Sequence, residues 1–259
     1  MDGLILAAGF GSRLRGLYPS KPLALVKGVT LLEISLRQLV SAGCDRVVVV
    51  TGYQADLIED AILQISGRVS CEIITKRIDN WEKPNGYSVM AGASILPGNY
   101  LLVMCDHLLS IPILRGLAEA EGEGRGVTLA IDRTTQSPLI DPDDATWVET
   151  GENGFIKRIG KGLEHFDAVD CGAFLATPAL AGAIQRAIDE GRQGSLSDGM
   201  QWLADRGAAA TLDIGTAWWM DVDDPKAHAM AEELLDDRLS LLERGSASAP
   251  ILEDLAALA

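Results

Sequence analysis

The sequence predicts an α/β fold with a mostly parallel sheet flanked by helices. Apolar runs alternate with helical patterns through the first 131 residues. Residues 47–50 are four consecutive valines without polar alternation, as is typical of a parallel strand covered on both faces. The apolar run at residues 4–7 breaks directly into a glycine-rich turn. Strands that alternate with helices of about 10–15 residues indicate right-handed βαβ units.

The first half supplies the repeating units of this Rossmann-like sheet. We expect strands at residues 4–7, 46–51, 70–75, 100–105 and 126–131. We expect helices between them at residues 31–42, 55–65, 87–96 and 112–120. Gly43 suits the position after the first helix, and Pro112 suits the first turn of the last one.

The pattern changes after Asp132, where polar turns separate shorter strands. Strands are expected at residues 146–149, 155–158, 168–176 and 210–214, and helices at 178–190 and 195–205. Asp224 is predicted to cap a further helix, with Pro225 in its first position, that continues to about residue 242. We therefore expect one domain over residues 1–243, in two halves (1–131 and 132–243), the second with a small β subregion. We expect residues 244–259 to form a C-terminal tail that includes an apolar, helical stretch.

Composition narrows the classes of function. A net charge of −15 argues against a surface for nucleic acid or acidic membranes, since both repel an acidic protein. No apolar run approaches the roughly 20 residues that span a bilayer, and the start lacks the basic segment of a signal peptide. We expect a cytoplasmic protein. The four cysteines form no CxxC pair, so buried free thiols are expected rather than a zinc site.

The glycine-rich turn predicts a nucleotide-binding loop. A loop that follows a strand exposes backbone N–H groups that bind phosphate oxygens, and glycines let the backbone approach a ligand. Arg13 can grip phosphate with a planar fork, whereas Lys21 is a mobile point charge. The residues expected to bind nucleotide in this loop are Leu6, Ala7, Ala8, Gly9, Gly11 and Ser12.

Carboxylates after distant apolar runs predict a metal site. Asp106 follows the run at residues 101–105, and Asp221 follows Trp218-Trp219-Met220. Ligands of open α/β sheets bind beyond the carboxyl ends of the parallel strands, so Asp106 should lie beside the phosphate loop. Paired carboxylates there can hold Mg²⁺ together with substrate phosphates. Asp223 is ambiguous, because it could serve either the metal or the loop.

These residues resemble the nucleotidyltransferases that join an NTP to a phosphorylated sugar or alcohol, with a GT-A-like fold. The matching pieces span residues 6–221: LAAGFGSRL (6–14), KPL (21–23), VTGY (50–53), Asp106 and WMD (219–221). Within that group, NGYS (85–88), CDH (105–107), IGKGL (159–163) and DCG (170–172) are most similar to CTP:inositol-1-phosphate cytidylyltransferases. The chain departs from the pattern at Cys105, where Gly or Ser is typical, and at Cys171, where Thr is typical. The second change puts one acceptor-side hydrogen bond in doubt.

The resemblance implies a role for each charged residue. Arg13 and the loop would hold the β- and γ-phosphates of CTP, and Lys21 would stabilise the α-phosphate under attack. Asp106 and Asp221 would carry Mg²⁺. Lys161 would pair with the acceptor phosphate. His107, Asp170 and Gly172 would lie on the acceptor side, His107 in a positioning or contact role.

Polar side chains near the loop are candidates for reading the base. The carboxamide of Asn85, followed by Gly86, offers both a donor and an acceptor to cytosine. Asn80 is a second candidate, although Asn is common in loops for backbone reasons. Thr51, at the end of the second expected strand, would border the base or ribose.

Two further functions stay open at this point. One is another enzyme of the same fold, a phosphocholine cytidylyltransferase or a sugar-1-phosphate nucleotidylyltransferase; Trp81, Trp218 and Trp219 could supply an aromatic cage for choline. The other is a nucleotide-sensing protein without catalysis, which would be expected to lose Lys21, Asp106 or Asp221. The expected ligands are CTP and inositol 1-phosphate or another phosphorylated alcohol. A homodimer and a separate membrane CDP-alcohol phosphotransferase are open alternatives for protein partners.

Overall fold

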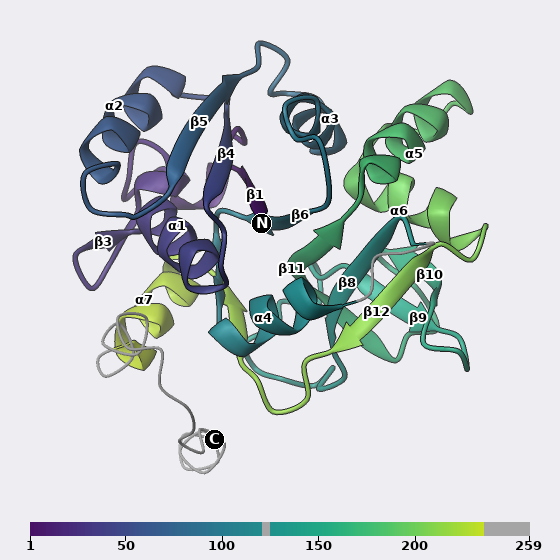
Figure 1. Ribbon diagram of the computed structural model, residues 1–259. Coiled ribbons are helices and arrows are strands. Elements are labelled where there is room, and N and C mark those ends of the chain that lie inside the picture. Colours follow the sequence, from purple (N-terminus) through teal and green to yellow (C-terminus); the bar gives the residue numbers. More distant parts are fainter. Residues whose placement is uncertain (121–124, 236–259) are drawn as a thin grey trace.

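The fold is an α/β sandwich around one mixed sheet (Figure 1). The computed structural model describes residues 1–120 and 125–235. The first half of the chain provides four parallel strands in the spatial order β6-β1-β4-β5. Their bounds are β1 Asp2–Leu6, β4 Arg46–Thr51, β5 Glu72–Arg77 and β6 Tyr100–Met104. The α/β fold class expected from the sequence is confirmed.

Strand β11 (Ala168–Ala176) joins the two halves of the sheet. It pairs antiparallel with β6 through Ala173–Ala176 and with β8 (Val127–Asp132) along the opposite edge. Val169 pairs with both β8 and β9 (Trp147–Thr150), so β9 lies on the edge opposite β8. Strand β10 (Ile156–Gly160) pairs antiparallel with β9, and β12 (Ala209–Asp213) pairs parallel with β8. Because β11 runs against β6, the parallel character of the sheet holds on the first side and is mixed beyond it.

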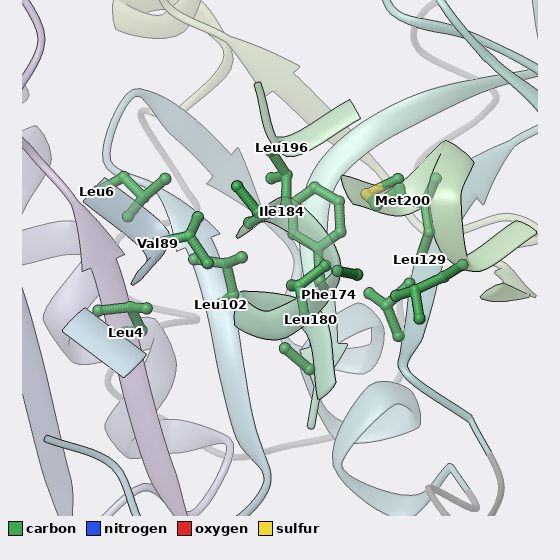
Figure 2. Packing of buried hydrophobic residues seen from close by; sticks show 14 of the residues in the cluster. Leu4, Leu6, Val89, Leu102, Leu129, Phe174, Leu180, Ile184, Leu196 and Met200 are labelled. Carbon is green, nitrogen blue, oxygen red and sulfur yellow. The ribbon is translucent and has the colours of Figure 1, made fainter. Parts of the chain in front are cut away.

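The helices cover both faces of the sheet because successive strand residues point to opposite sides. Leu4 and Leu6 pack on the side of α3 (Gly86–Ala93), α5 (Pro178–Asp189) and α6 (Leu196–Ala204), as Figure 2 shows. Ile5 packs on the other side, with α1 (Leu31–Ser41), α2 (Ala55–Ile65) and α4 (Ile111–Glu119). The valines at 47–50 divide in the same way, so β4 is buried on both faces as expected.

Several short elements were not expected from the sequence. They are the 3-10 turns Ser12–Leu14 and Lys21–Leu23, the hairpin of β2 (Leu25–Val26) and β3 (Val29–Thr30), and the ladder of β7 (His107–Leu109) with β13 (Trp219–Asp221). Elements of two or three residues are too short to show a hydrophobic period, so the sequence pattern does not predict them. The β7–β13 ladder pairs His107 with Asp221, which matters for the site.

The last described helix begins as expected. Asp224 accepts a hydrogen bond from the Ala227 N–H, and Pro225 opens α7 (Pro225–Leu234). The expected continuation to residue 242, the boundary at 243 and the tail at 244–259 all lie outside the described residues. Across residues 1–120 and 125–235, every helix is too short or too polar to cross a membrane.

Candidate active site

The loop after β1 forms one wall of a cavity of about 310 Å³. Gly11 has a φ of +58°, and a Cβ there would lie 2.6 Å from the Cβ of Lys21, so only glycine fits. Within the described residues, the N–H groups of Gly9 and Gly11 have no protein acceptor. The expected loop residues all line this first cavity: Leu6, Ala7, Ala8, Gly9, Gly11, Ser12, Arg13 and Lys21. Unpaired N–H groups beside two cations suit phosphate oxygens.

Lys21 is a buried cation surrounded by carboxylates. Its side chain is 8% exposed, and its Nζ lies 2.6 Å from Asp106 Oδ2 and 3.8 Å from Asp221 Oδ1. It also contacts the carboxylate of Asp223, which in turn accepts from Arg13. Asp223, ambiguous in the sequence, therefore bridges the two cations of the phosphate loop.

Asp106 and Asp221 lie close together because strand β6 and the β7–β13 ladder place them side by side. Asp106 follows β6, and the β7–β13 ladder places Asp221 opposite His107, the next residue along the chain. Ligand atoms of Asp106, His107 and Asp221 lie within 4.8 Å of one another. Among the described residues, Asp221 Oδ1 is a buried oxygen without a hydrogen-bond donor. A buried orphan oxygen beside a second carboxylate is a donor set that suits a hard divalent cation such as Mg²⁺.

Burial and neighbouring charges shift the pKa values of the ionisable groups at this site in different directions. Burial disfavours charge on Asp106, but the Lys21 ammonium and the His107 hydrogen bond hold the pKa of Asp106 well below its usual range. Burial raises the pKa of Asp221, helped by the nearby Asp106 charge. Burial opposes protonation of His107, but the Asp221 and Asp106 carboxylates raise its pKa to about 9. Asp106 is therefore ionised and His107 is cationic at neutral pH.

A second cavity of about 260 Å³ adjoins the first and contains the residues expected on the acceptor side. His107 lies in its wall, stacked on Trp219 with ring centroids 5.8 Å apart. Gly172 has a φ of +71°, and a Cβ there would lie 2.3 Å from His107 Cδ2. Trp219 in turn donates to Asp132 at 3.0 Å. His107 is thus held between an indole and a glycine that cannot be enlarged.

Asp170 faces the same cavity from β11. Its Oδ1 accepts the N–H of Gly172 at 2.7 Å, which fixes the left-handed turn at that glycine. Burial raises the pKa of Asp170 to about 6. Cys171 between them is fully buried, and burial raises its pKa well above the usual value, so its thiol is a packing group. Cys44 and Cys105 are also buried, as the sequence predicted, whereas Cys71 is only partly buried.

Lys161 and Arg13 come from opposite halves of the chain and share one partner. Each donates to the carboxylate of Asp144, and Arg13 also lies 3.7 Å from Asp141. Sequence reasoning missed Asp144, because the segment Asp141-Pro142-Asp143-Asp144 has the composition of an ordinary turn. Arg13 lines both cavities and Lys161 lines the second, so their shared partner brings a cation of the acceptor side next to one of the phosphate loop.

The candidate base readers have different positions. Asn85 lines both cavities, and its Oδ1 accepts the N–H of Leu196 at 2.8 Å. Gly86 lines neither, but a Cβ there would lie 2.2 Å from the Gly194 carbonyl oxygen, so its role is close packing of α3. Thr51 is fully buried and donates to Glu59, and exposed Asn80 also lies outside both cavity walls. Neither Thr51 nor Asn80 is placed to touch a ligand in these two cavities.

Among the lining residues that the sequence reasoning about nucleotide binding missed, three lie just before α3 or within it. Trp81, Lys83 and Ser88 line the first cavity. They belong to the segment before α3 and to its first turns, where the sequence pointed to the two asparagines for base reading and to Trp81 only for a choline cage. Their closeness to Asn85 along the chain was the available signal.

Curated relatives match most of this chain. A protein of Rubrobacter xylanophilus described as a bifunctional IPC transferase and DIPP synthase is 34% identical over 237 residues, which cover 89% of this chain and 51% of the relative. A protein of Aquifex aeolicus with the same description is 31% identical over 90% of this chain and 51% of its own length. The chain therefore spans about half the length of these relatives.

A solved structure and a family model complete the comparison. The inositol-1-phosphate CTP transferase of T. maritima superposes with a TM-score of 0.76 at 24% identity, covering 91% of this chain and 96% of that one. This similarity supports the fold. The model of the MobA-like NTP transferase domain matches residues 3–197, which include the phosphate loop, Lys21, Asp106 and Lys161. The chain belongs to the MobA-like NTP transferase family.

Proposed function

We propose that this protein is a Mg²⁺-dependent cytidylyltransferase that transfers CMP from CTP to inositol 1-phosphate, giving CDP-inositol and pyrophosphate. The observation that carries the proposal is the shared border of the two cavities. Arg13, Asn85, Met104, Asp106 and Asp223 line both of them. A group transfer between two substrates needs two adjoining sites with the charge-stabilising groups where they meet. The description of these relatives as IPC transferases supports this substrate pair.

On the nucleotide side, the chain neutralises and positions phosphates. The free N–H groups of Gly9 and Gly11, with Arg13, would hold the β- and γ-phosphates that leave as pyrophosphate. Lys21 would lie against the α-phosphoryl group, where negative charge accumulates. Mg²⁺, held by Asp106 and Asp221, would supply charge neutralisation on the phosphoryl oxygens when bound.

On the acceptor side, Lys161 would bind the phosphate whose oxygen attacks the α-phosphorus of CTP. That phosphate monoester is already largely ionised near neutral pH, so no protein group needs to remove a proton. His107, Asp170 and the turn at Gly172 would position the polyol. In this scheme the phosphate loop and Lys21, from residues 1–131, would serve the nucleotide, and Lys161, Asp170 and Gly172, from residues 132–243, would serve the acceptor together with His107.

The second cavity favours a polyol over choline. A quaternary ammonium group prefers the exposed face of an aromatic ring. Trp219 is in the wall of this cavity, but His107 already stacks on its ring. Trp81 lines only the first cavity, and Trp218 lines neither. The wall also contains Thr146 and Ser197, whose hydroxyls can hydrogen-bond the hydroxyls of a polyol.

A sensor without catalysis is also disfavoured. The Lys21 ammonium lies within 4 Å of a carboxylate oxygen of Asp106 and of one of Asp221. A protein that only binds nucleotide has no need for a buried lysine placed between two carboxylates.

We further propose that a membrane CDP-alcohol phosphotransferase consumes the product, because the relatives are described by two activities.

Pyrophosphate release tests the function. The purified chain is assayed with CTP and MgCl₂ and, in turn, inositol 1-phosphate, phosphocholine and glucose 1-phosphate. We expect release that depends on inositol 1-phosphate, with CDP-inositol as the second product by mass spectrometry. Faster turnover with phosphocholine would replace the proposed acceptor. CTP binding without release for any acceptor would reject the enzyme in favour of the sensor.

A further inference from the structure

Strand β5 leaves one edge of the sheet without a neighbouring strand. Among residues 1–120 and 125–235 it pairs only with β4, and Figure 1 shows it at that end of the sheet, beside α2. The N–H groups of Glu72 and Ile78 donate toward β4, so the odd-numbered residues of β5 turn outward. In the described part of the chain, no hydrogen bond reaches the outward backbone groups of Ile73, Thr75 and Arg77. Such an edge can accept another strand.

One face of β5 is complementary in charge to its own copy. Glu72, Ile74 and Lys76 alternate onto the face that packs toward α3. An antiparallel pair bonds outward residues to outward residues, so a two-fold axis between two copies must pass beside one residue. An axis beside Ile74 sets Glu72 opposite Lys76 of the partner subunit, which pairs opposite charges. An axis beside Thr75 instead sets Ile74 opposite the partner's Lys76, and an axis beside Lys76 sets two lysines face to face.

Both charges on this face are available to a partner. Glu72 is exposed, and Arg46 near it is already held by two hydrogen bonds to Asp2. Lys76 has no ion-pair partner among the residues that the structure describes. Charged side chains on an edge strand usually prevent pairing. On β5 they attract a second copy in one register and oppose other strands, so they favour self-association over aggregation.

An exposed leucine extends this edge on the other face of the sheet. Helix α2 begins beside the end of β5, where Arg77 pairs with Asp56 and Glu59. Leu63 follows Asp56 by two helical turns, so it shares the same helix face and lies about 10 Å further along. That length corresponds to about three strand residues, which brings Leu63 level with Ile74. Its side chain is 74% exposed, the highest value among the large hydrophobic residues of the described chain.

We propose that β5 binds β5 of a second copy of this chain, antiparallel about a two-fold axis beside Ile74, and that the two sheets become one. The outward groups of Ile73 bond those of the partner's Thr75, and the symmetry forms each contact twice. Glu72 pairs with the partner's Lys76 on one face, while Leu63 meets its own copy on the other. No residue of β5 lines either cavity, so both cavities stay open in the dimer.

The mass of the chain in solution tests the interface. Analytical ultracentrifugation over a range of chain concentrations measures the monomer–dimer Kd, and we expect the wild type to dimerise. Lys76→Glu sets two pairs of like charges across the axis and should weaken the dimer by about tenfold. The double variant Glu72→Lys/Lys76→Glu restores opposite charges and should return the Kd to within about threefold of wild type. Lys157→Glu, on β10 at the other end of the sheet, is the matched control and should leave the Kd unchanged.

Cysteine cross-linking tests the register of the two strands. The partly buried native thiol before β5 is first removed by Cys71→Ser. Ile74→Cys should then form a disulfide-linked dimer on oxidation, since opposed Cα atoms of an antiparallel pair lie about 5 Å apart. Thr75→Cys should not, because the two copies of residue 75 are diagonal neighbours about 7–8 Å apart.

Three results would overturn the inference. They are a wild type that stays monomeric at every concentration, a Kd that Lys76→Glu leaves unchanged, and a disulfide through Thr75→Cys in place of Ile74→Cys. Leu63→Glu gives an independent check at an exposed position, where folding does not depend on the side chain. It should weaken the dimer as well, and an unchanged Kd in that variant would remove α2 from the interface.

Discussion

Lys21 Nζ lies 2.6 Å from Asp106 Oδ2 and 3.8 Å from Asp221 Oδ1, so one buried ammonium group faces both carboxylates proposed to hold the metal. These residues come from the loop after β1, the turn after β6 and the short strand β13. The contact ties the phosphate loop to the metal ligands. A substitution at any of these three residues should therefore change the electrostatic environment of the other two.

Replacing Lys21 by Met should remove most of the catalysis. The variant keeps the length of the side chain but loses the charge that would stabilise the α-phosphoryl group and that lowers the pKa of Asp106. We expect kcat for pyrophosphate release to fall by about 100-fold or more, the magnitude typical of losing one preorganised charge-stabilising group. Lys157→Met removes an exposed lysine paired with Glu149 and should retain full kcat. A Lys21→Met enzyme with a tenth of wild-type kcat would contradict the assigned role.

Asp221→Asn should weaken the response to metal. The substitution keeps the shape of the side chain but removes the carboxylate charge from the donor set. We expect the half-saturating Mg²⁺ concentration for pyrophosphate release to rise by about 10–100-fold, with partial recovery at high Mg²⁺. Asp189→Asn, on the exposed face of α5, is the matched control. An unchanged Mg²⁺ dependence would remove Asp221 from the metal site.

Gly172→Ala should affect the acceptor and leave the nucleotide alone. A Cβ at Gly172 would lie 2.3 Å from His107, and its φ of +71° adds backbone strain. Displacing His107 should raise the KM for inositol 1-phosphate by tenfold or more while the CTP affinity stays within twofold. Gly182→Ala in α5 meets no atom within 4 Å and should stabilise the helix slightly. Loss of CTP binding in Gly172→Ala would instead indicate general misfolding.

Asp170→Asn should change how stability depends on pH. Burial raises the pKa of Asp170 to about 6, above its value in an unfolded chain. Such a group contributes stability below about pH 4, and this contribution is lost as the pH rises through 6. The asparagine variant still accepts from Gly172 but is never charged, so its unfolding free energy should exceed that of wild type by up to about 3 kcal/mol at pH 8. Urea unfolding at pH 4.5 and pH 8 measures the difference, and an equal difference at both values would contradict the assignment.

Much of the fold was predictable because long elements carry their own pattern. The expected helix at residues 55–65 and the expected strands at 46–51 and 168–176 coincide with α2, β4 and β11. The antiparallel pairing of β11 with β6 was not predictable, since burial on both faces does not reveal strand direction. The β7–β13 ladder is too short to show alternation. Its consequence, the meeting of Asp106 and Asp221, was reached only from their positions after apolar runs.

The site divides in the same way. Residues that the loop sequence itself specifies, such as Gly11 and Lys21, lie where they were expected. Thr51 and Asn80 do not line either cavity, because their distance from the site depends on side-chain direction at the ends of segments, which periodicity does not give. Asp144 was missed for a different reason. Asp144 matters because it contacts Arg13 and Lys161, which are 131 and 17 positions away in the sequence, and the local sequence around Asp144 does not indicate these contacts.

Pairing of β11 with β6 also limits how substrates can enter and leave. The strands beneath both cavities belong to one hydrogen-bonded sheet, so a hinge between the two halves would have to break the ladder from Ala173 to Ala176. Opening and closing must instead take place in the connecting segments that carry Arg13 and Asp144. Product release then requires only that a few surface ion pairs rearrange, while the sheet beneath the cavities keeps its structure. The rate of product release should therefore depend on ionic strength more than on the stability of the whole domain.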